Sequence, residues 1–348
     1  MPKSGENIER LECVYYPGPV PSDLSVLTTL CFVYDKIYFP RVSLPLGGYD
    51  KVELQREIVR LEALNDKSHK TGRLIGILKF LEWRNTLDGI LEYPSPDSIF
   101  GKTESSHIQK MARMIYDVNF PPKENFEPMF ETGSSKGLPG GDESVDFAGD
   151  FFYQAEALSF SAERNIPVID DGSGLALPFK AKYKDCAQPL STIMAIESIK
   201  TIMPKLPILT PQEIVEFRME NKEELKNFRA AMLRLSSTLN GQISEQSSDE
   251  EVQKKAKFIV ETQVVPSLHE LNRDLQNPNR AWYKRFIDGA SITASVAVGV
   301  ITGGPAGTTA AVGLTKILAS EIEAKGDKAT NVKHNGLYYL VRAQAALK

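Results

Sequence analysis

The chain has 348 residues, with 41 Lys and Arg against 45 Asp and Glu, so its formal net charge is −4 at pH 7. This length suits two domains with a sizeable core, and the mildly acidic balance excludes a surface that binds nucleic-acid backbones over its whole extent. The three cysteines lack C-x-x-C spacing and indicate reduced thiols. Residues 1–12 lack the apolar core of a secretion signal. We therefore expect a cytoplasmic protein.

Residues 1–207 predict an α/β domain. Leu11 to Tyr16 and Lys36 to Val42 are rich in aromatic and β-branched residues, as strands are, and a helix capped at Ser22 and Asp23 separates them. Such a strand–helix–strand unit favours a parallel, right-handed crossover. Further on, the pattern predicts helices at 52–64, 74–91, 106–116, 146–163 and 191–203. It also predicts a long loop at 119–144 and a short strand at 166–169.

Residues 208–348 predict an all-α domain, which begins after the proline-rich break at 204–207. Thr210, Pro211 and Glu213 form a capping box with proline at the first helical position. Apolar residues then follow one helical stripe from Ile214 to Leu239. A second helix begins after Ser248, and we expect a kink at Pro266. The two helices predict a long antiparallel arm.

The segment 289–320 predicts a glycine-rich helical hairpin. No charged residue lies between Gly289 and Thr315, and Pro305 follows a Gly-Gly pair that suits a turn between two helices. Small residues recur at every fourth position, which allows another backbone to approach closely. We expect this packing or interface role for Ser295, Gly299, Gly303, Gly307 and Ala311.

The hairpin raises the question of a membrane. A spanning helix needs about 20 mostly apolar residues, whereas the glycines dilute this segment and the Gly-Gly-Pro turn divides it into short arms. We therefore expect a hairpin that packs within the folded protein and stays out of the membrane at rest. A hairpin that inserts into a membrane on activation is the alternative.

One stretch carries candidate catalytic acids. The run from Ala155 to Asp171, an alanine-rich helix followed by Ile-Pro-Val-Ile-Asp-Asp, resembles the closing helix–strand unit of PIN-domain nucleases. That resemblance implies a Mg²⁺ or Mn²⁺ site in which Asp170 or Asp171 is the acid at the strand end and Asp150 or Glu156 is the helix acid. Clustered carboxylates of this kind activate water for phosphodiester hydrolysis. Asp150 and Asp170 are the expected metal ligands.

A simpler interpretation of the same acids is structural. The chain has Val-Tyr-Tyr-Pro where the PIN family places an acid on its first strand. Asp170, Asp171 and Gly172 then form a turn, while Asp150 and Glu156 are solvated helix residues. No cofactor is expected under this interpretation.

The whole layout resembles uncharacterised bacterial proteins associated with anti-phage defence. The residues that carry this resemblance are the Tyr-Tyr-Pro opening, Tyr34 to Ile37, the Ile-Pro-Val-Ile-Asp-Asp strand, the Glu-Phe-Arg and Asn-Phe-Arg helix, and the apolar hairpin. It implies a cytosolic defence or stress-response protein that acts mainly through association with a protein partner or with a second copy. The alternatives are a divergent metal-dependent nuclease, which would bind nucleic acid, and a membrane-perturbing effector that uses the hairpin at 289–320.

Overall fold

The chain divides into two units by its internal contacts, and the division falls within helix α1 (Leu24–Cys31). The α/β unit comprises Glu12–Leu27 and Tyr34–Lys180, and the helical unit comprises Met1–Leu11, Thr28–Val33 and Ala181–Lys348. The computed structural model describes residues 11–21, 23–40, 51–64, 69–94, 105–120, 127–129, 134–136, 144–179, 182–203, 209–274, 299–301 and 336–346.

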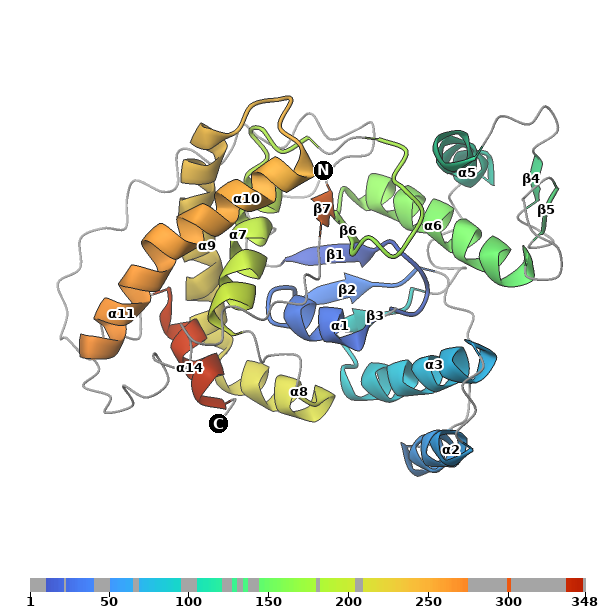
Figure 1. The fold of residues 1–348 in the computed structure, drawn as a ribbon, viewed down its shortest axis with the longest axis horizontal. Coiled ribbons are helices and arrows are strands. Elements are labelled where there is room, and N and C mark those ends of the chain that lie inside the picture. Colours follow the sequence, from blue (N-terminus) through green and yellow to red (C-terminus); the bar gives the residue numbers. More distant parts are fainter. Residues whose placement is uncertain are drawn as a thin grey trace. The chain divides into compact units, whose positions relative to one another are not determined.

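The α/β unit is built on short parallel strands. In the sheet, β3 (Leu91–Glu92), β2 (Lys36–Tyr38), β1 (Glu12–Tyr15) and β6 (Val168–Asp170) lie in that order (Figure 1). Val14 on β1 pairs with Tyr38 on one side and with Val168 on the other. The predicted parallel strand–helix–strand opening is thereby confirmed, while the two-residue strand β3 was not predicted because it is too short to show a period.

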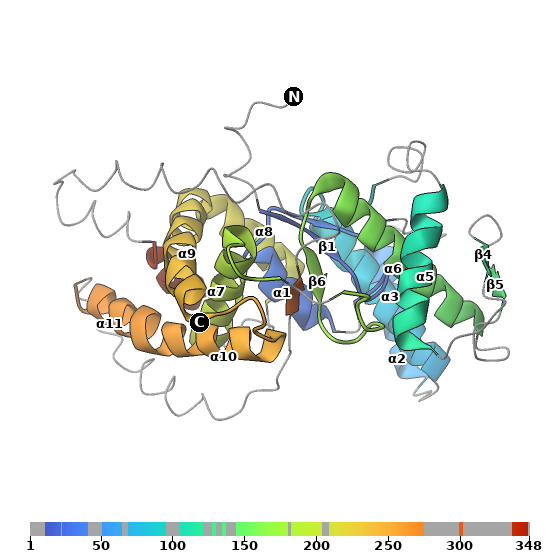
Figure 2. The same ribbon diagram turned by 90° about the horizontal axis from the view of Figure 1, so that it is seen from above.

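The described helices of the α/β unit are the first part of α1, α2 (Lys51–Ala63), α3 (His69–Thr86), α5 (Ser105–Asn119) and α6 (Ser144–Arg164). α6 contacts β1 and β6, and α5 packs beside α6 (Figure 2). Within the segment predicted as a loop, β4 (Glu127–Met129) and β5 (Ser134–Lys136) form an antiparallel ribbon.

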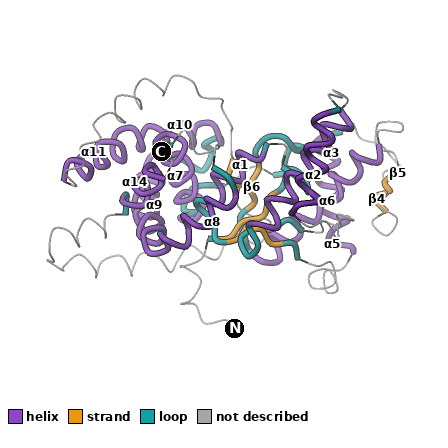
Figure 3. Tube along the Cα trace, turned by 90° about the horizontal axis from the view of Figure 1, so that it is seen from below, coloured by secondary structure: helices purple, strands orange, loops and turns teal. Residues whose placement is uncertain are grey.

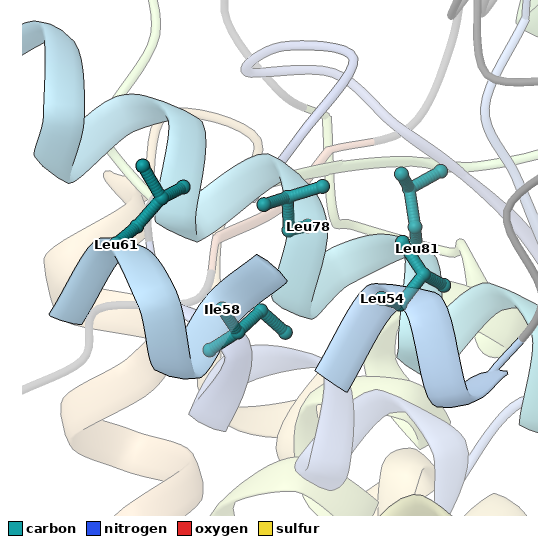
Figure 4. Packing of buried hydrophobic residues seen from close by; sticks show 5 residues of the cluster. All are labelled: Leu54, Ile58, Leu61, Leu78 and Leu81. Atoms are coloured by element: carbon teal, nitrogen blue, oxygen red, sulfur yellow. The ribbon is translucent and has the colours of Figure 1, made fainter. Parts of the chain in front are cut away.

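An apolar cluster joins α2 to α3. Leu54, Ile58 and Leu61 project from α2 toward Leu78 and Leu81 of α3 (Figure 4). Spacings of three and four residues place the three α2 side chains on one face of the helix. This face is the only apolar face of α2 that is buried within the described part of the unit.

The helical unit contains α7 (Ala187–Ile202), α8 (Pro211–Glu220), α9 (Lys222–Gln242), α10 (Asp249–Ile259), η2 (Val260–Val264), α11 (Val265–Asp274) and α14 (Tyr338–Ala346). α7 packs against α9 and α10, and helices dominate this part of the chain (Figure 3). The capping box at Thr210 and the cap at Ser248 are both present. An α/β part followed by a mainly helical part is therefore confirmed.

The predicted stripe from Ile214 to Leu239 is broken at Asn221, where α8 ends and α9 begins. Asn221 is almost fully buried, and its backbone has left helical geometry with φ at −121°. Its side-chain Nδ2 donates to the carbonyl of Phe217 at 2.8 Å, and its Oδ1 accepts from Nε of Arg342 at 2.9 Å. A buried amide that needs partners thus separates two helices that apolar spacing alone predicts as one.

The kink expected at Pro266 takes the form of one π-helical turn. In η2 the N–H of Val265 donates to the carbonyl of Val260, five residues earlier. Pro266 cannot donate a backbone hydrogen bond and its ring would clash with the carbonyl of Thr262 in a regular α-helix. The wider turn before it accommodates this local misfit.

The helical unit binds the carboxyl end of α1 through three consecutive carbonyls. Arg218 donates to the carbonyl of Cys31. Arg229 donates through Nε and Nη2 to the carbonyl of Val33, at 2.9 and 2.6 Å. The hydroxyl of Tyr339 donates to the carbonyl of Phe32 at 3.2 Å. Carbonyls that a helix end leaves without intrahelical partners are satisfied here by cationic and phenolic donors.

The predicted hairpin at 289–320 lies largely outside the described residues. Within it the structure describes β7 (Gly299–Ile301), which contacts α7. The prediction of a helix is wrong at these three residues, because a glycine followed by two β-branched residues favours extended backbone. Ser295, Gly303, Gly307 and Ala311 lie outside the described residues. Their packing role stays a prediction.

The predicted boundary at residue 207 also stays a prediction. The contact-based division begins the main part of the helical unit at Ala181, so that α7 belongs with the later helices. In the described part of the chain, no helix combines the length and the apolar character needed to cross a membrane.

Replacing Phe228 by Ala should lower the free energy of unfolding by about 3–5 kcal/mol. Phe228 is fully buried and stacks on the ring of Tyr339 with centroids 5.4 Å apart. Phe258→Ala is the matched control, because this side chain on α10 is 58% exposed; its effect should stay within about 0.5 kcal/mol. Urea unfolding followed by circular dichroism measures both, and equal effects would contradict the assigned core.

Candidate functional site

The candidate site lies at the carboxyl ends of β1 and β6. The chain leaves β1 toward β2 and later returns to the opposite side of β1 through β6. In open α/β sheets the place where strand order reverses in this way is where ligands commonly bind. The residues that follow the two strands are Tyr16 and Pro17 after β1, and Asp171 to Gly174 after β6.

A short hydrogen bond joins the two strand ends. The hydroxyl of Tyr15 donates to Oδ2 of Asp171 at 2.5 Å. The other oxygen of Asp171 accepts from the backbone N–H of Ser173 at 2.9 Å and from its hydroxyl at 2.5 Å. One carboxylate oxygen of Asp171 therefore stabilises the turn after β6, and the other attaches this turn to β1.

Helix α6 completes this connection from the side. The hydroxyl of Tyr153 donates to the carbonyl of Tyr15 at 2.6 Å, and Nε2 of Gln154 donates to the carbonyl of Pro17 at 2.9 Å. Gly174 packs against the same place, since a Cβ there would lie 2.6 Å from Nε2 of Gln154 and 2.8 Å from Cα of Pro17. The turn after β6 can approach β1 this closely only with glycine at 174.

Asp170 and Tyr16 are the second acid and the second tyrosine at these strand ends. The N–H of Tyr16 donates to the carbonyl of Ile169 at 2.9 Å, which continues the β1–β6 register beyond the strands. Oδ1 of Asp170 accepts from the N–H of Gly172 at 2.9 Å, as in an Asx turn. Gly172 has φ at +80°, a left-handed conformation that suits glycine.

Burial and charge hold the tyrosines of this site in the neutral form. Burial, followed by the Asp171 carboxylate, raises the pKa of Tyr15 well above its ordinary value. Burial also raises the pKa of Tyr16, and the charge of Asp170 adds to this shift. The pKa of Tyr153 is raised chiefly by burial. The phenols of Tyr15 and Tyr153 act as hydrogen-bond donors, and none of the three phenols serves as a general base at neutral pH.

The other predicted acids belong to α6. Glu156 is fully buried, so its interpretation as a solvated helix residue is wrong. Asp150 lies within α6, but its side chain is outside what the structure describes. Among the described residues, no group of three or more His, Cys, Asp or Glu side chains is placed to hold a metal ion. The structure thus joins Asp170 and Asp171 in one turn, and convergence with Asp150 stays a prediction.

No family model, curated protein or solved structure matches this chain.

Sequence reasoning missed Tyr15, Tyr153 and Gln154 as parts of the site. The sequence pattern predicts only a strand at Tyr15 and only a helix at Tyr153 and Gln154. The available signal was the placement of Tyr and Gln in segments that are mostly apolar, at 151–160 and 13–16. Such buried polar atoms need hydrogen-bond partners, but sequence alone does not show which backbone carbonyls they reach.

The raised tyrosine pKa values predict loss of stability at alkaline pH. A folded-state pKa above the unfolded value contributes stability that is present below about pH 10 and declines as the pH rises above it. For Tyr38, which burial and then Glu12 raise to a pKa of about 12, the loss falls between about pH 10 and 12. For Tyr15, whose pKa is higher, the loss continues at about 1.4 kcal/mol per pH unit.

Tyr15→Phe should therefore flatten the alkaline decline of unfolding free energy relative to wild type. Because the variant also loses the hydrogen bond to Asp171, its stability at pH 7 should be lower by about 1–2 kcal/mol. Urea unfolding at pH 7, 9 and 11 measures both effects. An unchanged alkaline slope would show that Tyr15 ionises as freely in the folded protein as in the unfolded chain.

Proposed function

We propose that this chain is a bacterial cytosolic protein of host defence or stress response that acts mainly through protein association. The defence assignment rests on the resemblance of the whole layout to bacterial proteins associated with anti-phage defence. The association mechanism rests on apolar side chains that are exposed on the surface of the α/β unit. On this proposal, the partner is another protein or a second copy of the chain.

The observation that carries the association mechanism is where apolar side chains are exposed. Of the large apolar side chains that are exposed among the described residues, four lie on α2, directly after it, or on α3. The remaining three are distributed over α5, α8 and α10. The first group is Val52, Val59, Leu64 and Leu74, and the second is Val118, Met219 and Phe258. Exposed apolar groups that gather on one helical pair are typical of interaction surfaces.

The candidate site supports the same proposal. Asp171 accepts three hydrogen bonds within its own turn and from Tyr15. Tyr153 donates to the carbonyl of the last residue of β1, and Gln154 donates to a carbonyl of the loop that follows. Side chains used in this way stabilise the strand ends, and a role in fixing the fold accounts for each of these contacts.

The finer architecture of the C-terminal part belongs to this proposal. We infer that α9, with the helices from α10 to α11, forms the long antiparallel arm, and that the segment around Gly303 packs as a hairpin on a partner surface. Apolar side chains that are buried on both helices support the arm, among them Met232 on α9 and Ile259 on α10. The hairpin lies largely outside the described residues. The residues on which a membrane-inserting role would depend lie there too.

A divergent metal-dependent nuclease is the second candidate. It is favoured by one observation, the position of Asp170 and Asp171 at the carboxyl end of a parallel strand where the strand order reverses. In that case Asp150 and Asp170 would bind Mg²⁺ or Mn²⁺, and Glu156 or Asp171 would complete the acid set.

A plaque assay in a phage-sensitive bacterial strain distinguishes the two candidates. Expression of wild type should lower the number of plaques, and Asp170→Asn should protect equally well, because association does not need this charge. Purified wild type should also leave nucleic acid intact in the presence of Mn²⁺. Loss of protection by a folded Asp170→Asn variant would favour the nuclease, and no protection by wild type across a panel of phages would contradict the defence assignment.

A further inference from the structure

Helix α2 has two apolar sides, of which the α2–α3 cluster uses one. Leu54, Ile58 and Leu61 face α3. Val52 and Val59 are 61% and 64% exposed. Because seven residues make almost two helical turns, these two valines lie within about 20° of each other around the axis. At 3.6 residues per turn they project to the side opposite the cluster.

The exposed valines belong to a continuous stripe. Arg56 and Ala63 follow Val52 and Val59 at helical spacing, and both are exposed. A single exposed valine is ordinary on a protein surface. A stripe at positions 52, 56, 59 and 63 is the spacing with which one helix packs against another.

The charges beside this stripe are arranged for pairing with the same helix in reverse. Glu53 and Arg60 lie on one flank, next to Val52 and Val59 respectively. On the other flank Gln55 donates to Glu82 at 2.9 Å and Glu62 pairs with Lys79 at 2.7 Å, so that flank is committed to α3. The flank that faces away from α3 thus carries an acid near the helix start and a base near its end.

An antiparallel pair of α2 helices places these charges opposite each other. In antiparallel packing the same flanks meet, so Glu53 of each copy faces Arg60 of the other, and this happens twice by symmetry. Arg60 now pairs with Glu57 of its own helix at 2.9 Å and is largely exposed, so it can exchange this contact. A parallel pair would bring opposite flanks together, so Glu53 and Arg60 would face the flank whose Gln55 and Glu62 already bind α3.

We propose that the stripe formed by Val52, Arg56, Val59 and Ala63 is the docking surface for α2 of a second copy, in antiparallel orientation. The proposal rests on the proposed association function and names its partner. The valines pack against each other across the two-fold axis, and the Glu53–Arg60 pairs select the orientation.

The first test is the oligomeric state of the full-length protein by sedimentation equilibrium over a range of concentrations. Wild type should dimerise. Val59→Asp should raise the dimer dissociation constant more than about tenfold, because a carboxylate would replace an apolar side chain in the contact between the two α2 helices. Val118→Asp is the matched control, since this valine on α5 is also exposed, at 53%, and its dimer should be unchanged. Circular dichroism confirms that both variants are folded.

The second test uses charge reversal. Glu53→Arg and Arg60→Glu should each weaken the dimer, and the double variant should restore it, because the pairs are re-formed with reversed signs. A wild type that is monomeric at all concentrations, a Val59→Asp dimer as tight as wild type, or a double variant no better than the singles would each overturn the proposal.

The plaque assay separates failure of this inference from failure of the proposed function. A monomeric wild type that still protects cells would overturn the α2 pairing and leave association with another protein standing. A dimer that forms through α2 but gives no protection would support the pairing and contradict the defence assignment.

Discussion

The hydrogen bond from Tyr15 to Asp171 is the contact on which the α/β unit depends. It joins the ends of β1 and β6 at 2.5 Å, and the carbonyl of Tyr15 in turn accepts from Tyr153 of α6. One residue therefore connects two strands and the helix that covers them. Because the Tyr15 side chain is fully buried, loss of this hydrogen bond would leave a buried hydroxyl without a partner, at a measurable cost in stability.

In the helical unit, side chains likewise donate hydrogen bonds to backbone carbonyls, at the end of α1. Arg218, Tyr339 and Arg229 satisfy the carbonyls of Cys31, Phe32 and Val33 in succession. The rings around them pack at the same place, since Phe32 stacks on Phe217 with centroids 5.1 Å apart. A short segment from early in the chain is thus held among helices that come more than 180 residues later. In both units, polar contacts to the backbone fix where apolar elements meet.

The elements that sequence predicted well are those fixed by local chemistry. The capping box at Thr210, the cap at Ser248 and the parallel pairing of β1 with β2 all follow from residues close in sequence. The break between α8 and α9 at Asn221 could not be predicted in this way, because the side chain of Asn221 accepts a hydrogen bond from Arg342, which lies 121 residues later in the chain. The candidate site was predicted only in part. Asp170 and Asp171 were placed correctly at a strand end, whereas Tyr15 and Tyr153 reach partners that local sequence does not reveal.

Asp171 and Asp170 hold the turn after β6 through hydrogen bonds with Tyr15, Gly172 and Ser173, and we propose that this strand end serves as a structural joint. A Mn²⁺ titration of wild-type protein, followed by amide NMR, tests this role most directly. If the joint is structural, the amide signals of Tyr15, Tyr16 and residues 170–174 should keep their intensity at stoichiometric Mn²⁺. Selective paramagnetic broadening of these signals, reversed by a chelator, would contradict it.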